Sequence, residues 1–145
     1  MSTLKKIRVF FDSSVLIAGL ASPDGASNML LVMCEMGFIT PVISEKVVTE
    51  VIRNIERKLP RCLPHYHRLF KTLPFELADP TPELITQAQK MINQKDADIL
   101  AAAINAGVAY LVSLDKHFLN INFPDCNIQI CTPGDLLEKI ELSEV

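Results

Sequence analysis

Two short apolar runs in the sequence each end on an aspartate. Ile7–Phe11 leads directly into Asp12, and Tyr110–Leu114 leads into Asp115. Apolar runs of this length are typical of buried strands. In open α/β folds the carboxyl ends of parallel strands meet at one edge of the sheet, where ligand sites lie. We therefore expect the two aspartates at the same edge.

The rest of the sequence alternates strand and helix patterns, without a linker, an internal repeat or a low-complexity stretch. Further strands are expected over 38–43, 75–77 and 128–131. Helices are expected over 13–20, 29–36, 45–55, 82–92, 97–105 and 132–142. This alternation predicts an α/β fold of three layers (α/β/α), in which helices cover a central parallel sheet, within a single domain over 1–145.

Prolines complicate this pattern in two places. Pro41 interrupts the strand over 38–43, which indicates either a weaker strand or an edge position. Pro60, Pro64 and Pro74 interrupt the stretch that follows the third helix, which is therefore expected to be a loop. The segment after Asp115 is also expected to be a loop.

Composition places the chain among globular proteins. With 145 residues, 49% of them hydrophobic, and a mean hydropathy of +0.25, it is long enough to bury a core. No apolar run approaches the roughly 20 residues that span a bilayer. The first apolar segment is too short for a signal peptide, so the expected location is cytoplasmic. The four cysteines form no CxxC pair, and reduced structural thiols are expected.

The net charge of −3 argues against a general nucleic-acid coat, but the charge is unevenly distributed. Residues 53–71 contain six Lys or Arg and two His, opposed only by Glu56. Such a patch is either a solvated helix face and loop or a surface that meets a phosphate backbone. Tyr66 is a candidate for stacking on a base, whereas His65 and His67 are expected to have surface or loop roles.

Two further acids lie where helices can carry them to the edge that holds Asp12 and Asp115. Glu50 flanks the apolar stripe of the helix that begins after Ser44. Asp96 opens an alanine-rich helix and precedes Asp115 by 19 residues, enough for one short helix, a turn and a strand. Taken singly, each acid has an ordinary explanation as a turn former, a helix cap or a solvated helix residue.

Taken together, four converging carboxylates predict a cation between them. Their mutual repulsion is strong at an effective dielectric constant of about 20. Mg²⁺ or Mn²⁺ relieves it, because hard cations take carboxylate oxygens as ligands. Such an ion supplies the Lewis acidity that phosphate hydrolysis needs. The sequence therefore predicts metal-dependent phosphate chemistry at this edge.

Four segments carry a resemblance to a known family: Phe10–Ile17, the surroundings of Glu50, Lys95–Ala103 and Tyr110–Phe118. Over essentially the whole chain, down to the Thr-Pro-Gly-Asp stretch before the last helix, the sequence resembles PIN domains. The resemblance implies a ribonuclease that uses one or two Mg²⁺ or Mn²⁺ ions. Many PIN domains are VapC-type toxins of toxin–antitoxin pairs.

Position by position, the resemblance assigns the catalytic and metal-binding roles to four acids: Asp12, Glu50, Asp96 and Asp115. Ser14 and Ser113 fit positions that support a carboxylate or a water by hydrogen bonds. Asp98 is the alternative to Asp96 as the third ligand. The register of the following apolar residues favours Asp96, which leaves Asp98 as a supporting acid or a solvated neighbour.

The resemblance also implies an RNA substrate and, if the chain is a toxin-type PIN domain, an antitoxin segment over the acidic edge and a homodimer. The apolar helix over 29–36 is either a dimer face or a core element. An alternative within the same fold is a PIN-like RNA-binding or protein-interaction module with weak or absent catalysis. Haloacid-dehalogenase-like phosphatases need an aspartate where this chain has Ser14. Response-regulator receivers need one after a middle strand, where this chain has Ser44.

Overall fold

Five parallel strands form the centre of the fold. They are β1 (Ile7–Phe11), β2 (Ile39–Ile43), β3 (Glu76–Leu77), β4 (Tyr110–Val112) and β5 (Gln129–Cys131). Their order across the sheet is β3-β2-β1-β4-β5, and every neighbouring pair is parallel. The computed structural model describes residues 6–121 and 127–143. The α/β class predicted from the sequence is confirmed.

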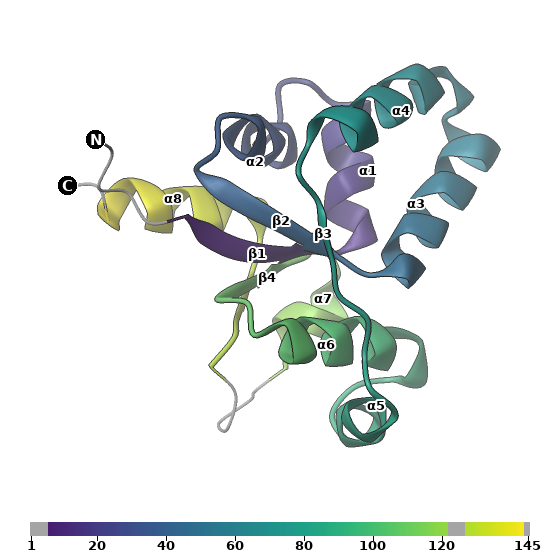
Figure 1. Cartoon of the computed structure of the whole chain (residues 1–145), viewed down its shortest axis with the longest axis vertical. Coiled ribbons are helices and arrows are strands. Elements are labelled where there is room, and N and C mark those ends of the chain that lie inside the picture. The colour runs from purple at the N-terminus through teal and green to yellow at the C-terminus, as the bar shows by residue number, and fades with distance from the viewer. Residues whose placement is uncertain (1–5, 122–126, 144–145) are drawn as a thin grey trace.

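Helices cover both faces of this sheet. They are α1 (Ser13–Ala21), α2 (Ala26–Glu35), α3 (Glu45–Lys58), the 3₁₀ turn η1 (Pro60–Cys62), α4 (Leu63–Thr72), α5 (Pro82–Gln89), α6 (Gln94–Ala106), α7 (Lys116–Leu119) and α8 (Pro133–Ser143). Figure 1 shows α1 to α4 on one side of the sheet and α5 to α7 on the other, which gives the expected three layers. The sequence placed the start of α2 three residues too late and did not predict α7.

The inner strands β1 and β4 are mostly buried because, Arg8 apart, their residues are apolar or aromatic. Val9, Phe10 and Phe11 of β1 have no exposed surface, and neither do Leu111 and Val112 of β4. Parallel strands that are covered on both faces need such continuous apolar runs, rather than an alternation of apolar and polar residues. The same runs that revealed the strands in the sequence therefore form the core.

The chain changes direction across the sheet at β1. From β1 it proceeds to β2 and β3 on one side, and it then crosses to β4 and β5 on the other side. The carboxyl ends of β1 and β4 are thus neighbours at a topological switch point, where open α/β sheets place their ligand sites. Asp12 directly follows β1, and Ser113 directly follows β4.

Capping residues set where the two helices nearest this edge begin. Ser44 Oγ accepts a hydrogen bond from Val47 N at 3.3 Å and caps α3. Asn93 Oδ1 accepts from Asp96 N at 3.0 Å and caps α6. The helix predicted over 97–105 begins three residues earlier, at Gln94, so the cap is Asn93 and Asp96 belongs to the first turn.

Two expectations about prolines are corrected. Pro41 lies in β2, which is paired on both sides and is not an edge strand. However, β3 pairs only with Val42 and Ile43, so the missing N–H of Pro41 breaks no bond to β3. The stretch expected to be a loop is helical, because Pro60 and Pro64 lie in the first turns of η1 and α4. A missing N–H is no loss at those positions.

The apolar helices α1 and α2 pack into the fold. Within the described residues no single helix is long and apolar enough to cross a membrane. α1 and α2 reach that length only together, as a pair bent by 95°. Both bury leucines against the rest of the chain, namely Leu16 of α1 and Leu30 and Leu31 of α2.

Gly107, the residue at which α6 ends, offers a test of this arrangement. Its φ of 66° lies in the left-handed region that other residues adopt at a cost. An added Cβ would meet no atom within 4 Å, so the cost of Gly107→Ala is conformational rather than steric. We expect this change to lower the free energy of unfolding, measured by urea titration, by about 1 kcal/mol.

Gly134→Ala is the matched control. Gly134 lies in α8, its φ is not positive, and the nearest atom to an added Cβ is Thr132 Oγ1 at 4.0 Å. Alanine is the better helix former, so this variant should be as stable as the parent or more stable by up to about 1 kcal/mol. Equal destabilisation by the two substitutions would contradict a left-handed cap at Gly107.

Candidate active site

Asp12 is the most enclosed of the four predicted acids, with only 5% of its surface exposed. It connects β1 to α1 and caps the helix, because its Oδ1 accepts a hydrogen bond from Ser13 N at 2.9 Å. Its Oδ2 accepts from two hydroxyls, Ser14 Oγ at 2.9 Å and Ser113 Oγ at 2.7 Å. The carboxylate is thus held by donors from both sides of the switch point.

The backbone that leads to Asp115 fixes these two hydroxyls in turn. Leu114 N donates to Ser14 Oγ at 3.1 Å, and Asp115 N donates to Ser113 Oγ at 3.0 Å. Each hydroxyl therefore accepts a hydrogen bond from the backbone and directs its own proton at Asp12. The structure places both predicted supporting serines between Asp12 and the segment that carries Asp115.

Asp115 combines the positions of a strand end and a helix cap. It follows β4 by a short turn, and its Oδ1 accepts a hydrogen bond from His117 N at 2.9 Å. This bond caps α7, the short helix that the sequence did not predict. The cap uses one carboxylate oxygen and fixes the direction of the side chain.

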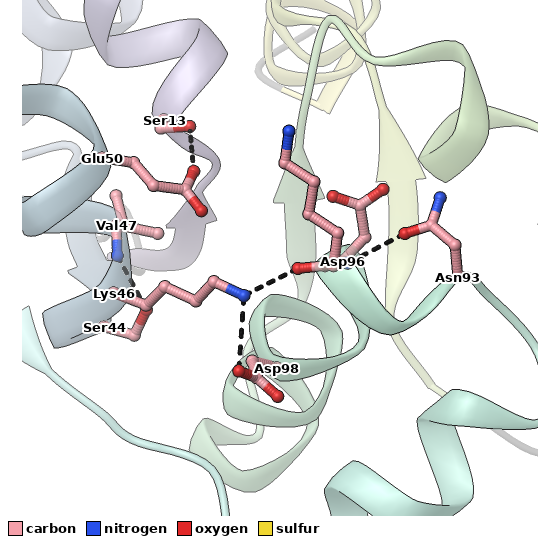
Figure 2. A network of polar contacts seen from close by, with 9 residues as sticks. Ser13, Ser44, Lys46, Val47, Glu50, Asn93, Asp96 and Asp98 are labelled. Carbon is pink, nitrogen blue, oxygen red and sulfur yellow. Dashed lines mark hydrogen bonds and ion pairs between the residues drawn. The ribbon is translucent and has the colours of Figure 1, made fainter. Parts of the chain in front are cut away.

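Glu50 reaches the site from α3. Ser13 Oγ donates a hydrogen bond to Glu50 Oε2 at 2.8 Å, as Figure 2 shows. Because Ser13 directly follows Asp12, this bond links Glu50 to the start of α1. Ser13 is not among the site residues that the sequence predicts. Its only signal was its place in the Asp-Ser-Ser run, where its neighbour Ser14 fitted the family position.

α6 brings Asp96 to the group of acids and turns Asp98 away from it. Asp96 is only 8% exposed, and the charges of Asp115 and Glu50 act on it. Asp98 instead pairs with Lys46 Nζ at 3.3 Å. In Figure 2 the two side chains leave the start of α6 in different directions. The structure therefore groups Asp96, and not Asp98, with the other acids.

Lys46 ties α3 to α6. Besides its ion pair with Asp98, its Nζ donates a hydrogen bond to Lys95 O at 2.7 Å (Figure 2). Over 6–121 and 127–143, no other side-chain hydrogen bond joins these two helices. Lys46 therefore links the helix that carries Glu50 to the helix that carries Asp96.

Burial and mutual repulsion act on the ionisation of these acids. Burial raises the pKa of Asp12 above its ordinary value, and its serine hydrogen bonds oppose the rise only in part. The pKa of Asp96 is raised first by burial and then by the charge of Asp115, with a smaller contribution from Glu50. The acids of α3, α6 and the two strand ends thus interact electrostatically across one site.

The donor set matches a hard divalent cation in chemistry. Carboxylate oxygens are the ligands that Mg²⁺ takes, together with several waters. Among the described residues the two ion pairs are Arg8–Glu76 and Lys46–Asp98, so neither neutralises the four acids. In the same part of the chain no three His, Cys, Asp or Glu side chains form a ready-made metal cluster. The four acids therefore lie at one edge of the sheet, but their side chains are not arranged around a single metal position.

The remaining predictions on reactive and binding side chains have mixed outcomes. Cys34, Cys62 and Cys131 are buried free thiols, and burial raises the pKa of Cys34 to about 12. Cys126 lies outside the described residues. The prediction that Tyr66 is available to stack on a base is wrong. It is 6% exposed and packs against Phe70, with the two ring centroids 4.6 Å apart.

The sequence profile of the PIN domain family matches residues 8–117, a stretch that contains all four acids. The chain belongs to the PIN domain family. The match to the family profile extends from the second residue of β1 to the start of α7. No curated protein matches the chain significantly.

Solved structures show the same PIN fold at low sequence identity. PAE2754 from Pyrobaculum aerophilum has a TM-score of 0.67 and 14% identity, covering 97% of this chain and 99% of that one. VapBC2 from Rickettsia felis, bound to a promoter DNA fragment, has a TM-score of 0.62 and 16% identity, covering 86% and 98%. VapC20 from Mycobacterium tuberculosis, a toxin that cleaves the sarcin–ricin loop, has a TM-score of 0.50 and 17% identity, covering 74% and 89%.

The raised pKa of Asp96 predicts a cost to stability. The folded state disfavours the ionised carboxylate, so stability falls as the pH rises from 3.8 through the raised pKa, and the cost is complete above it. We expect Asp96→Asn to raise the melting temperature near pH 7 in EDTA. The gain should shrink as the pH is lowered, because the wild-type carboxyl group then becomes neutral too.

Asp98→Asn is the matched control for this measurement. It removes the same charge from the same helix, but from a half-exposed ion pair with Lys46. Such pairs contribute about 0–1 kcal/mol, so this variant should be equally stable or slightly less stable. A gain from Asp98→Asn equal to that from Asp96→Asn would show that Asp96 is not the acid under repulsion.

Proposed function

We propose that this PIN domain is a metal-dependent ribonuclease that hydrolyses RNA phosphodiester bonds. The proposed ligands of Mg²⁺ or Mn²⁺ are Asp12, Glu50, Asp96 and Asp115. The observation that carries the proposal is the convergence of these carboxylates on one edge, where none is ion-paired within the described chain. A site that concentrates negative charge in this way is stabilised by a cation.

The surrounding side chains have positioning roles in this proposal. Ser14 and Ser113 fix the orientation of the Asp12 carboxylate, and Ser13 fixes that of Glu50. Lys46 sets the separation of α3 and α6. A divalent cation held by the acids supplies Lewis acidity at the scissile phosphate. Preorganised ligands keep the cost of reorganisation low when substrate binds.

A finer proposal is that the chain is the toxin of a toxin–antitoxin pair. Its support is the likeness of fold to VapBC2 and to the toxin VapC20. The proposed partner is an antitoxin segment that covers the acidic edge, and the proposed assembly is a homodimer. α2 and its C-cap residue offer exposed apolar side chains for such an assembly, since Met29 is 51% exposed and Met36, the C-cap, is 64% exposed. Its other face, with Leu30 and Leu31, belongs to the core.

The second candidate is a PIN-like RNA-binding or protein-interaction module with weak or absent catalysis. The observation that favours it is that the acids in the described chain do not form a ready-made metal cluster. The two candidates differ in one property, because only a nuclease cleaves RNA in a way that depends on the metal and on the acids.

Cleavage of a mixed RNA pool by the purified protein tests the proposal. With Mg²⁺ or Mn²⁺ we expect cleavage, and with EDTA none. Asp12→Asn should reduce the rate by at least about 100-fold, because even residues that only orient metal ligands are worth about 10–100-fold. The nearly isosteric amide keeps the volume of the buried site, and circular dichroism checks that the variant is folded.

Asp24→Asn is the control for loss of a carboxylate. Asp24 is exposed in the turn between α1 and α2 and takes no part in the contacts of the site. The control should cleave at the wild-type rate. If Asp12→Asn cleaves as fast as the wild type in the same metal, Asp12 is not a ligand. If the folded wild type cleaves in neither metal, the binding module becomes the better interpretation.

A further inference from the structure

We propose that an RNA strand leaves the acidic edge along one flank of α3, where Arg53 and Arg57 bind its backbone phosphates. This inference rests on the proposed ribonuclease function and adds the path of the substrate to it. Of the basic residues over 53–71, it assigns phosphate binding only to the two that share a flank of α3 with Glu50 of the candidate active site.

The periodicity of α3 places these arginines beside Glu50. Residues three, four and seven positions apart share a face of a helix. Arg53 and Arg57 follow Glu50 by three and seven positions, so the three side chains lie on one flank. At a rise of 1.5 Å per residue, the two arginines stand about 4.5 and 10 Å further along the helix than Glu50.

The rotation of α3 about its axis is fixed from two sides. Val47, Val51 and Ile55 are buried and hold one face of the helix against the core. On the flank next to this face, the hydrogen bond from Ser13 to Glu50 joins the helix to the acidic edge. The direction in which the flank faces is therefore set by contacts that do not involve the arginines.

Both arginines are available to a ligand. They are exposed, and no ion pair over 6–121 and 127–143 includes either of them. Lys46 lies on the same flank, on the other side of Glu50, and is already engaged by Asp98 and Lys95 O. On the Lys46 side of Glu50 the positive charge of the flank is already paired, whereas on the Arg53 and Arg57 side it is not. We therefore expect the RNA strand to run toward the two arginines.

The charge distribution along the sequence favours a polyanionic ligand for the segment that contains Arg53 and Arg57. The stretch 53–71 carries six Lys or Arg and one acid, whereas the rest of the sequence carries eight Lys or Arg and sixteen acids. Basic side chains bind nucleic acid by neutralising phosphates and releasing counterions. We infer RNA rather than an acidic protein segment, because the flank begins at the acids proposed to hold the scissile phosphate.

The test is the binding of a fluorescently labelled single-stranded RNA to the full chain in EDTA, followed by anisotropy at several salt concentrations. EDTA prevents metal-dependent cleavage, so binding is measured on its own. The double variant Arg53→Gln/Arg57→Gln should bind about 25-fold more weakly near 0.1 M salt, and its salt slope should fall by about 1.4. Both figures follow from a slope of log K against log salt concentration of about 0.7 per phosphate contact on single strands, counted for two lost contacts.

Arg68→Gln/Lys71→Gln is the matched control. It removes two positive charges from exposed positions of α4 in the same basic stretch, away from the flank of Glu50. Its affinity should stay within about twofold of the wild type, since it loses no phosphate contact. Equal weakening by the two double variants would overturn the proposal, because binding would then depend on net charge rather than on the flank.

Cleavage in Mg²⁺ separates this inference from the proposed function. If the wild type cleaves RNA while the Arg53/Arg57 variant binds as tightly as the wild type, the path along α3 is wrong and the nuclease stands. If binding depends on the two arginines but the wild type cleaves in no metal, the path stands and the nuclease is wrong. Wild-type protein that binds no single-stranded RNA overturns the path directly.

Discussion

The hydrogen bond from Ser113 to Asp12 is the contact on which the candidate site depends. It joins residues 101 positions apart, and it forms because β1 and β4 are neighbours at the switch point of the sheet. A carboxylate as buried as that of Asp12 needs donors to offset its desolvation. Two of the other acids are attached to this pair: Asp115 through its own N–H to Ser113 Oγ, and Glu50 through Ser13. The site is therefore a consequence of strand order.

This arrangement carries an energetic cost that the fold itself does not offset. Hydrogen bonds to Asp12 lower its pKa, but burial outweighs them, and Asp96 is raised further by its acidic neighbours. A chain selected only for stability would place apolar or paired residues at this edge, because unpaired buried charge is destabilising. Perturbed ionisation in a cluster of acids is characteristic of functional sites, and the helix caps that Asp12 and Asp115 form do not require four acids at one edge. The cost is thus itself an argument for a ligand.

The sequence predicted those features that local patterns determine. The strand that ends at Asp12 and the helix that Ser44 caps follow from neighbouring residues alone. The other predicted strand is too long, since β4 ends at Val112 and a short turn separates it from Asp115. From the sequence, only the register of the apolar residues that follow favours Asp96 over Asp98 as the third ligand. In the structure the choice depends on the cap that starts α6 and on Lys46 of a different helix. The prediction of a loop after α3 is wrong because sequence alone does not show whether a proline breaks a helix or lies in the first turn of the next one.

In the proposed function, α3 contributes to both binding and catalysis. Its buried stripe fixes the rotation of the helix, and a period of 3.6 residues then determines where every other side chain faces. Glu50 cannot enter the acidic edge unless Arg53 and Arg57 occupy the adjoining flank. An opposite rotation would move all three side chains away from the site together. In the proposed function and substrate path, the chemistry at the acids and the course of the RNA strand both depend on this apolar packing, and the basic flank acts locally although the net charge of the chain is −3.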